Sequence, residues 1–112
     1  RFGDWELRAG PPAEGEVVLD AAALGAVVRV RAWREGDRMR PAGLGGTKTL
    51  QDLFTDRKVP RELRRTLPVV EAQGEIAWVA GVAVSERFRA APGAPRAVGL
   101  SARRVGRRRP GE

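Results

Sequence analysis

The chain has 112 residues, enough for one domain with a single hydrophobic core, and 42% of them are hydrophobic. It carries 21 Lys and Arg against 14 Asp and Glu, a formal net charge of +7, with no cysteine and no histidine. These absences exclude disulfides, zinc sites built on thiolate or imidazole, and catalytic pairs built on histidine. No apolar run approaches the roughly 18 residues of a membrane-spanning helix, and no signal-peptide pattern opens the sequence. Because the first residue is not methionine, we interpret the chain as part of a longer protein. We expect that protein to be cytoplasmic.

The first third of the chain predicts three short strands. Residues 1–9 and 17–19 have the apolar pattern of two strands, on either side of a turn rich in proline and glycine. Residues 27–33 alternate apolar and basic side chains, with Val28 and Val30 on one face. This alternation predicts a half-buried strand.

A helix is expected after the glycine-rich loop that follows. Thr49 has the character of an N-cap, and Leu50, Leu53 and Phe54 recur at helical spacing. We therefore predict a helix over residues 49–57 whose apolar stripe faces the core.

The next elements are a second helix and a hairpin. Pro60 suits the first turn of a helix over residues 60–66. Residues 69–70 and 76–84 are apolar and are separated by Gln73-Gly74, which predicts a hairpin turn. Together, these elements indicate an α+β domain of small antiparallel or mixed sheets with two short helices over residues 1–89.

The last part of the chain is dominated by proline, glycine, alanine and arginine. Residues 90–112 carry 6 Arg against 1 acidic residue and show no apolar period. We predict a disordered basic tail over this range.

Positive charge is concentrated in the middle of the chain. Residues 29–65 carry 11 Lys and Arg against 5 Asp and Glu. Such a patch indicates a docking face for a polyanion, although a solvated surface rich in arginine gives the same pattern. The loop at 43–49 has no Walker pattern. Its glycines and Lys48 fit a phosphate contact and fit an ordinary surface loop equally well.

Other residues have a structural and a functional reading. The aromatic side chains are more typical of a core than of base-stacking platforms: Trp33, Phe54 and Trp78. The acidic residues fit turn, cap and ion-pair roles better than a metal cluster: Asp37, Asp52 and Asp56. A free-standing enzyme is disfavoured because no base, nucleophile or metal set converges.

Three short motifs follow one another between residues 28 and 89. They are R-x-G-D-R-x-R-P at 34–41, D-x-K-V-P-R at 56–61 and W-V-x-G at 78–81. In this order and spacing they resemble the C-terminal domain of bacterial tRNA(Ile)-lysidine synthetase.

The resemblance implies a function for the parent protein. Enzymes of this family use ATP to adenylate the wobble cytidine of isoleucine tRNA and then attach free lysine. The resemblance assigns that chemistry, with ATP and Mg²⁺, to an N-terminal catalytic domain whose S-G-G-x-D-S loop does not occur here. It implies that the C-terminal domain holds no cofactor and grips the tRNA around the acceptor stem. It also implies a sandwich-like fold related to a domain of the phenylalanyl-tRNA synthetase β chain.

The resemblance and the distribution of charge together predict the site and the partners. Nine residues are expected to bind tRNA: Arg34, Arg38, Arg40, Lys48, Arg57, Lys58, Arg61, Arg64 and Arg65. Family members often carry two adjacent basic residues where this chain has Lys48-Thr49, so one phosphate contact is in doubt. The expected partners are tRNA(Ile) and the protein's own catalytic domain, with no membrane and with a homodimer left open. The alternative is a protein–protein docking or dimerisation module of the same or another RNA-modifying enzyme.

Overall fold

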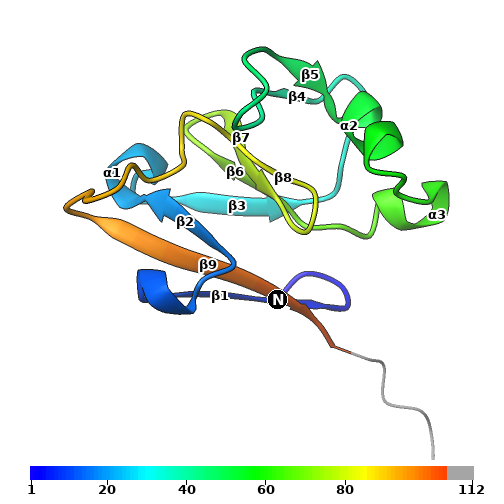
Figure 1. Ribbon diagram of the computed structural model, residues 1–112. Helices are drawn as coiled ribbons and strands as arrows, with labels where there is room; N and C mark the ends of the chain where they lie inside the picture. Colours follow the sequence, from blue (N-terminus) through cyan, green and yellow to red (C-terminus); the bar gives the residue numbers. More distant parts are fainter. Residues whose placement is uncertain (106–112) are drawn as a thin grey trace, which may run out of the picture.

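Small antiparallel sheets and short helices make up the computed structural model, which describes residues 1–105 (Figure 1). The elements are β1 (Trp5–Gly10), the 3-10 helix η1 (Pro12–Glu14), β2 (Val17–Asp20), α1 (Ala21–Leu24), β3 (Val28–Arg31), β4 (Arg38–Met39), β5 (Lys48–Thr49), α2 (Leu50–Asp56), α3 (Arg61–Arg64), β6 (Val69–Ala72), β7 (Glu75–Val79), β8 (Ala83–Val84) and β9 (Ala97–Arg104). The sheets have the strand orders β1-β9-β2, β3-β6-β7-β8 and β4-β5, and all pairs are antiparallel. The α+β prediction is confirmed. None of the described helices is long and apolar enough to cross a membrane.

The four-stranded sheet lies between two other layers, with β4, β5, α2 and α3 on one side and the β1-β9-β2 sheet on the other (Figure 1). Successive residues of β6 show this directly. Val69 packs into a cluster with residues of α2, whereas Val70 packs into a cluster that contacts the β1-β9-β2 sheet. The middle sheet is therefore covered on both faces, which explains why β6 and β7 are apolar and largely buried.

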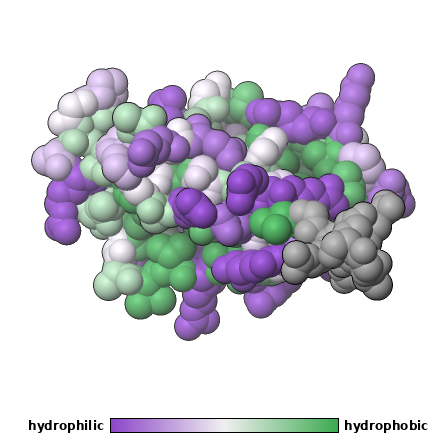
Figure 2. Space-filling view, turned by 90° about the horizontal axis from the view of Figure 1, so that it is seen from below, coloured by the Kyte–Doolittle hydropathy of each residue, from purple (hydrophilic) through white to green (hydrophobic). Residues whose placement is uncertain are grey.

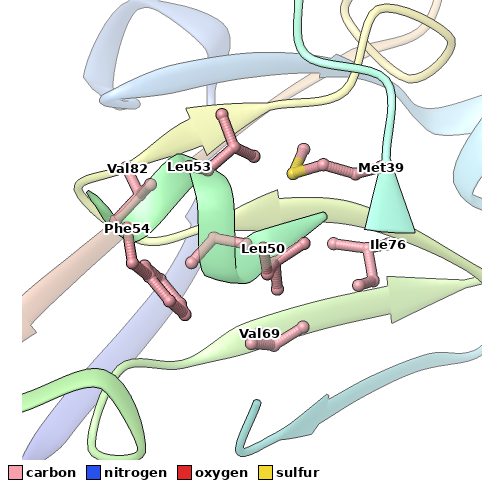
Figure 3. Close-up of a cluster of buried hydrophobic side chains, with 8 residues drawn as sticks. Met39, Leu50, Leu53, Phe54, Val69, Ile76 and Val82 are labelled. Carbon is pink, nitrogen blue, oxygen red and sulfur yellow. The ribbon is translucent and has the colours of Figure 1, made fainter. Parts of the chain in front are cut away.

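The core on the helix side is built around α2 (Figure 3). Leu50, Leu53 and Phe54 are essentially fully buried and share one cluster with Met39, Val69 and Ile76. This confirms the predicted helix and its apolar stripe. The second helix is shorter than expected: only Arg61–Arg64 is helical, and none of these four residues is fully buried.

The hairpin prediction is also confirmed. Gln73 and Gly74 both adopt positive φ, 53° and 75°, as a two-residue type I′ turn requires, and they join β6 to β7. Residues 76–84 form two strands, β7 and β8, rather than one. Gly81, with φ 74°, turns the chain between them.

The strand β3 is present, but its burial differs from the prediction. Val28 and Val30 are 43% and 38% exposed. They belong to an edge strand and line an apolar groove between the two larger sheets, together with Leu7 and Leu100. The β1-β9-β2 sheet leaves this groove open, so the expected burial of the strand is wrong. Figure 2 shows the molecule from the side of that sheet, with apolar patches among hydrophilic side chains.

The prediction of a disordered tail is wrong for Ala97–Arg104. These residues form β9, the central strand of the three-stranded sheet, which pairs with both β1 and β2. Val98 and Leu100 lie two residues apart and so point to the same face of β9. Both pack against buried residues between the β1-β9-β2 sheet and the four-stranded sheet, so this short segment does bury an apolar face. The domain therefore extends at least to Arg104 and not to residue 89. Residues 106–112, the rest of the predicted tail, lie outside the described residues.

Because β9 lies very close to the turn after β1, adding one methyl group at Gly99 is predicted to destabilise the domain. A Cβ on Gly99 would lie 2.5 Å from the Pro11 carbonyl oxygen and 2.9 Å from Gly15 Cα. Because backbone atoms cannot move aside freely, we expect Gly99→Ala to lower the free energy of unfolding by about 1–3 kcal/mol in urea titrations. Gly46→Ala is the matched control, since its Cβ would meet nothing within 4 Å. Equal stability of the two variants would contradict the described seating of β9.

Candidate nucleic-acid interface

An ion-pair cluster holds the turn that contains the G-D-R motif. The Arg31 guanidinium donates to both carboxylate oxygens of Asp37, at 2.9 and 3.0 Å, and to Glu71 of β6 at 3.1 Å. The Asp37 carboxylate also accepts the Arg34 backbone N–H at 2.8 Å, and the Asp37 carbonyl accepts that of Leu50 at 2.9 Å. Asp37 thus joins the end of β3, the following turn and the start of α2.

The electrostatics of this cluster keep both partners charged. Burial by itself would raise the pKa of Asp37, but the hydrogen bonds from Arg31 and from the Arg34 backbone outweigh burial and lower it. The same hydrogen bond to Asp37 raises the pKa of Arg31. The side chains of Arg31 and Asp37 are only 16% and 13% exposed. Arg31 is therefore a structural cation and is not available to a polyanion.

The lowered pKa of Asp37 predicts a pH dependence of stability. Its contribution is present above the unfolded pKa of about 3.9 and is lost as the pH falls through the lower folded value. We expect Asp37→Asn to cost about 1–3 kcal/mol at pH 7, measured by urea unfolding, and to lose less on acidification to pH 3 than the unaltered chain. Glu35→Gln, an exposed change in the same turn, is the control. Parallel pH profiles for Asp37→Asn and the unaltered chain would contradict this role.

The helix α2 starts with a cap that the sequence predicted. The Thr49 hydroxyl accepts the backbone N–H of Asp52 at 3.1 Å. Lys48, the residue before it, forms an ion pair with Asp56 at the other end of α2. Lys48 is thus already paired within the domain, which weakens its case as a phosphate contact from the glycine-rich loop.

The end of α2 places a lysine in an unusual backbone conformation. The Lys58 N–H donates to the Thr55 carbonyl at 3.1 Å and the Val59 N–H donates to the Phe54 carbonyl at 2.8 Å, which together make a Schellman motif. Lys58 occupies its left-handed position, with φ 56°, where glycine is the usual residue. This geometry holds the exposed Lys58 in the bend between α2 and α3.

The structure separates the nine predicted residues into two groups. Around the α2–α3 bend lies the corner cluster, which we define as Arg34, Arg57, Lys58, Arg61, Arg64 and Arg65; Arg34 belongs to it because the neighbouring Trp33 contacts Arg65. The other three, Arg38, Arg40 and Lys48, lie in or next to the β4–β5 pair. Most of the nine are exposed, whereas Lys48 and Arg64 are partly buried.

One basic residue near the second group was missed. Arg87 lines the same groove as Arg38 and Arg40, forms an ion pair with Glu75, and lies over the Phe88 ring at 5.3 Å. The sequence offers little to single out Arg87, because this residue lies after the three motifs in a turn without a periodic apolar pattern.

The structural readings of the aromatic and acidic residues are supported. Phe54 and Trp78 are buried in the core, and Trp33 is half-buried against Phe54. Asp37 and Asp56 form ion pairs. The bond from Asp52 to the Thr49 hydroxyl is made by its backbone N–H, so the role of the Asp52 carboxylate stays a prediction. Within residues 1–105, no group of three or more acidic side chains is placed to hold a metal ion.

Comparison with known proteins identifies the class to which such a domain belongs. The family model described as "TilS substrate C-terminal domain" matches residues 28–100, more than half of the chain and including part of β9. A domain with this α+β fold is thus of the class described as C-terminal substrate domains. The chain belongs to the TilS substrate C-terminal domain family.

The curated relatives and a solved structure agree with this assignment. The chain is 43% identical over 91 residues to the tRNA(Ile)-lysidine synthase of Symbiobacterium thermophilum, covering 81% of the chain and 19% of that enzyme. It is 38% identical over 93 residues to the enzyme of Geobacter sulfurreducens, covering 79% of the chain and 20% of that enzyme. The chain thus spans about a fifth of the length of these relatives. A solved structure titled "Crystal structure of TILS C-terminal domain" superposes with a TM-score of 0.76 at 31% identity, covering 93% of the chain and 87% of that structure.

Proposed function

We propose that this chain is the tRNA-binding, non-catalytic C-terminal domain of a cytoplasmic tRNA(Ile)-lysidine synthase, and that the corner cluster binds the tRNA near its acceptor stem. The observation that carries the proposal is the corner cluster itself, which gathers exposed cations around the α2–α3 bend of a domain of this family. An RNA helix of the A form offers phosphates and 2′-hydroxyls rather than readable base edges in its deep major groove. Arginines on a rigid bend suit such contacts, because each guanidinium donates to two oxygens at once.

The ligase chemistry is proposed to lie outside this chain. The relatives are about five times longer than the matched region, and the S-G-G-x-D-S loop expected to bind ATP does not occur in these 112 residues. ATP and Mg²⁺ would bind in an N-terminal catalytic domain, which is the proposed intramolecular partner. The 112-residue chain contributes binding of the tRNA substrate and no group to the adenylation step.

This division of labour predicts that the isolated chain has no ligase activity. Incubated with ATP, lysine and isoleucine tRNA, it is expected to release no pyrophosphate above a blank, because it lacks a nucleotide loop, histidine and cysteine. Measurable pyrophosphate release that depends on all three substrates would show that the chain has catalytic machinery of its own.

The binding role is tested best at Lys58 and Arg61. Replacing Lys58 with glycine removes a charge and also relieves a left-handed backbone conformation, so Lys58→Gly is expected to fold at least as stably as the unaltered chain. Each lost phosphate contact should lower the slope of log K against log salt by about 0.7–0.9. We therefore expect Lys58→Gly and Arg61→Ala each to weaken tRNA binding and reduce this slope in titrations at several salt concentrations.

The matched control is Arg29→Ala. Arg29 is an exposed arginine of β3, on the sheet rather than at the α2–α3 bend, so its loss should change affinity little. If all three variants retain the affinity and the salt slope of the unaltered chain, the binding face is not the corner cluster.

A second candidate function is supported by a separate observation. Val27, Val28 and Val30 are 68%, 43% and 38% exposed beside the apolar groove of the edge strand β3. An exposed apolar edge of this kind favours a protein–protein or dimerisation contact. Sedimentation distinguishes the two candidates: a monomer with salt-dependent tRNA affinity supports the first, and self-association without tRNA affinity supports the second.

A further inference from the structure

Two arginines of the corner cluster lie over aromatic rings. The Arg65 guanidinium carbon is 4.9 Å from the centre of the Trp33 ring, and that of Arg64 is 5.7 Å from the centre of the Phe54 ring. The two rings contact each other edge to face, with their centres 5.5 Å apart at 90°. A continuous stack therefore runs from Arg65 through Trp33 and Phe54 to Arg64.

The base of this stack is rigid. Phe54 is completely buried in the core on the helix side, and Trp33 packs against that core. Trp33 also lies only two residues after Arg31 in the chain, and salt bridges to Asp37 and Glu71 hold the Arg31 side chain in place. Its indole Nε1 is buried without a hydrogen-bond partner among the described residues, so packing and not hydrogen bonding holds the ring.

Arg65 is held at the top of the stack and remains accessible. One of its terminal nitrogens donates to the Trp33 carbonyl at 3.4 Å, whereas the residue as a whole is exposed. A guanidinium has five N–H donors, so most of them remain free for an oxyanion. Arg64 differs, because it is partly buried and donates to the Val59 carbonyl at 3.0 Å.

An arginine that is ordered before binding is the stronger phosphate ligand. A flexible arginine loses side-chain entropy when it binds, and this loss subtracts from affinity. A ring that already restricts the guanidinium removes part of that loss, and cation–π contact keeps its plane in a defined orientation. Arg61, on the exposed side of α3, has no ring contact within residues 1–105 and serves as the comparison.

We propose that Trp33 is a positioning residue for RNA binding, whose indole holds the Arg65 guanidinium ready for a bidentate contact with the RNA backbone. This inference rests on the proposed function and deepens it. It assigns to Trp33 a role that the core contacts alone do not require, since a ring that served only as packing would leave the affinity contributed by Arg65 unchanged.

The test is a pair of double-mutant cycles on tRNA affinity, measured with the 112-residue chain. Arg65→Ala is expected to weaken binding about 5- to 10-fold, the range for one charge-assisted contact at an exposed site. Trp33→Leu should cause a similar loss, and Arg65→Ala should add little in the Trp33→Leu background. The control cycle combines Trp33→Leu with Arg61→Ala, whose effects should multiply independently. Trp33→Phe retains a ring and removes the unpaired indole N–H, so it should restore most of the affinity.

A readout without RNA separates this inference from the proposed function. In ¹⁵N NMR, the Arg65 Nε–H group should be ordered in the unaltered chain and in Trp33→Phe, and mobile in Trp33→Leu. If the unaltered chain binds no tRNA while Arg65 is ordered, the stack exists but the proposed function fails. If the chain binds tRNA and Arg65→Ala weakens binding equally with and without Trp33, the positioning role is overturned. If Trp33→Leu does not fold, the tRNA affinities of Trp33→Phe and Arg65→Lys are compared instead. The positioning role expects Trp33→Phe to keep most of the affinity and Arg65→Lys to lose it, since lysine keeps the charge but cannot make a planar bidentate contact. Equal affinities of these two variants would overturn the role.

Discussion

The ion pair between Arg31 and Asp37 is the constraint on which the rest of this domain depends. It fixes the end of an edge strand to the turn that follows, and Glu71 ties the same guanidinium to the neighbouring strand. Through its carbonyl, Asp37 also positions the first residue of α2. The helix that fills the core and the bend that carries the corner cluster therefore take their place from one nearly buried carboxylate. A polar group of this kind stabilises only when every partner is present, which gives the G-D-R motif a structural reason.

This arrangement divides the basic residues into two kinds. Arg31, Lys48 and Arg87 each meet a carboxylate of the domain, so their charge is largely balanced within the fold. No salt bridge is found among residues 1–105 for Lys58, Arg61 and Arg65, which are exposed around the α2–α3 bend. Arg29, Arg38 and Arg40 are also exposed and have no salt bridge among these residues, so cations without an internal partner occur on β3 and beside the β4–β5 pair as well as at the bend. Net charge favours association with a polyanion in general. Cations without a salt bridge in the described residues are most numerous around the α2–α3 bend, which is why we place the proposed interface there.

Sequence reasoning succeeded where local rules determine the structure and failed where distant strands do. The cap at Thr49, the stripe of Leu50 to Phe54 and the turn at Gln73-Gly74 each depend on a few neighbouring residues. The strand β9 depends on pairing with β1 and β2, more than 75 residues away in the chain, and its alternation is only three residues long. The exposure of β3 likewise depends on a distant part of the chain, because the β1-β9-β2 sheet does not cover this edge strand. For the site, the motifs located the corner cluster, but they did not distinguish paired cations from free ones or identify Trp33 as a partner of Arg65.

Two of the departures from local preference lie at the corner cluster, whereas a second buried indole N–H without a partner belongs to Trp5 of β1. Lys58 occupies a left-handed position that glycine fills at lower cost, and Trp33 buries an indole N–H without a partner. Gln73 also has a positive φ, but it is followed by Gly74 in a tight hairpin whose geometry requires it. The Schellman motif likewise requires the positive φ of Lys58, and glycine would fill either position at lower cost. Natural domains retain unfavourable local choices mainly where another demand outweighs stability. The departures at Lys58 and Trp33 border the same cations, and the proposed contact with tRNA would place one demand on both, which is the presentation of positive charge in a fixed orientation.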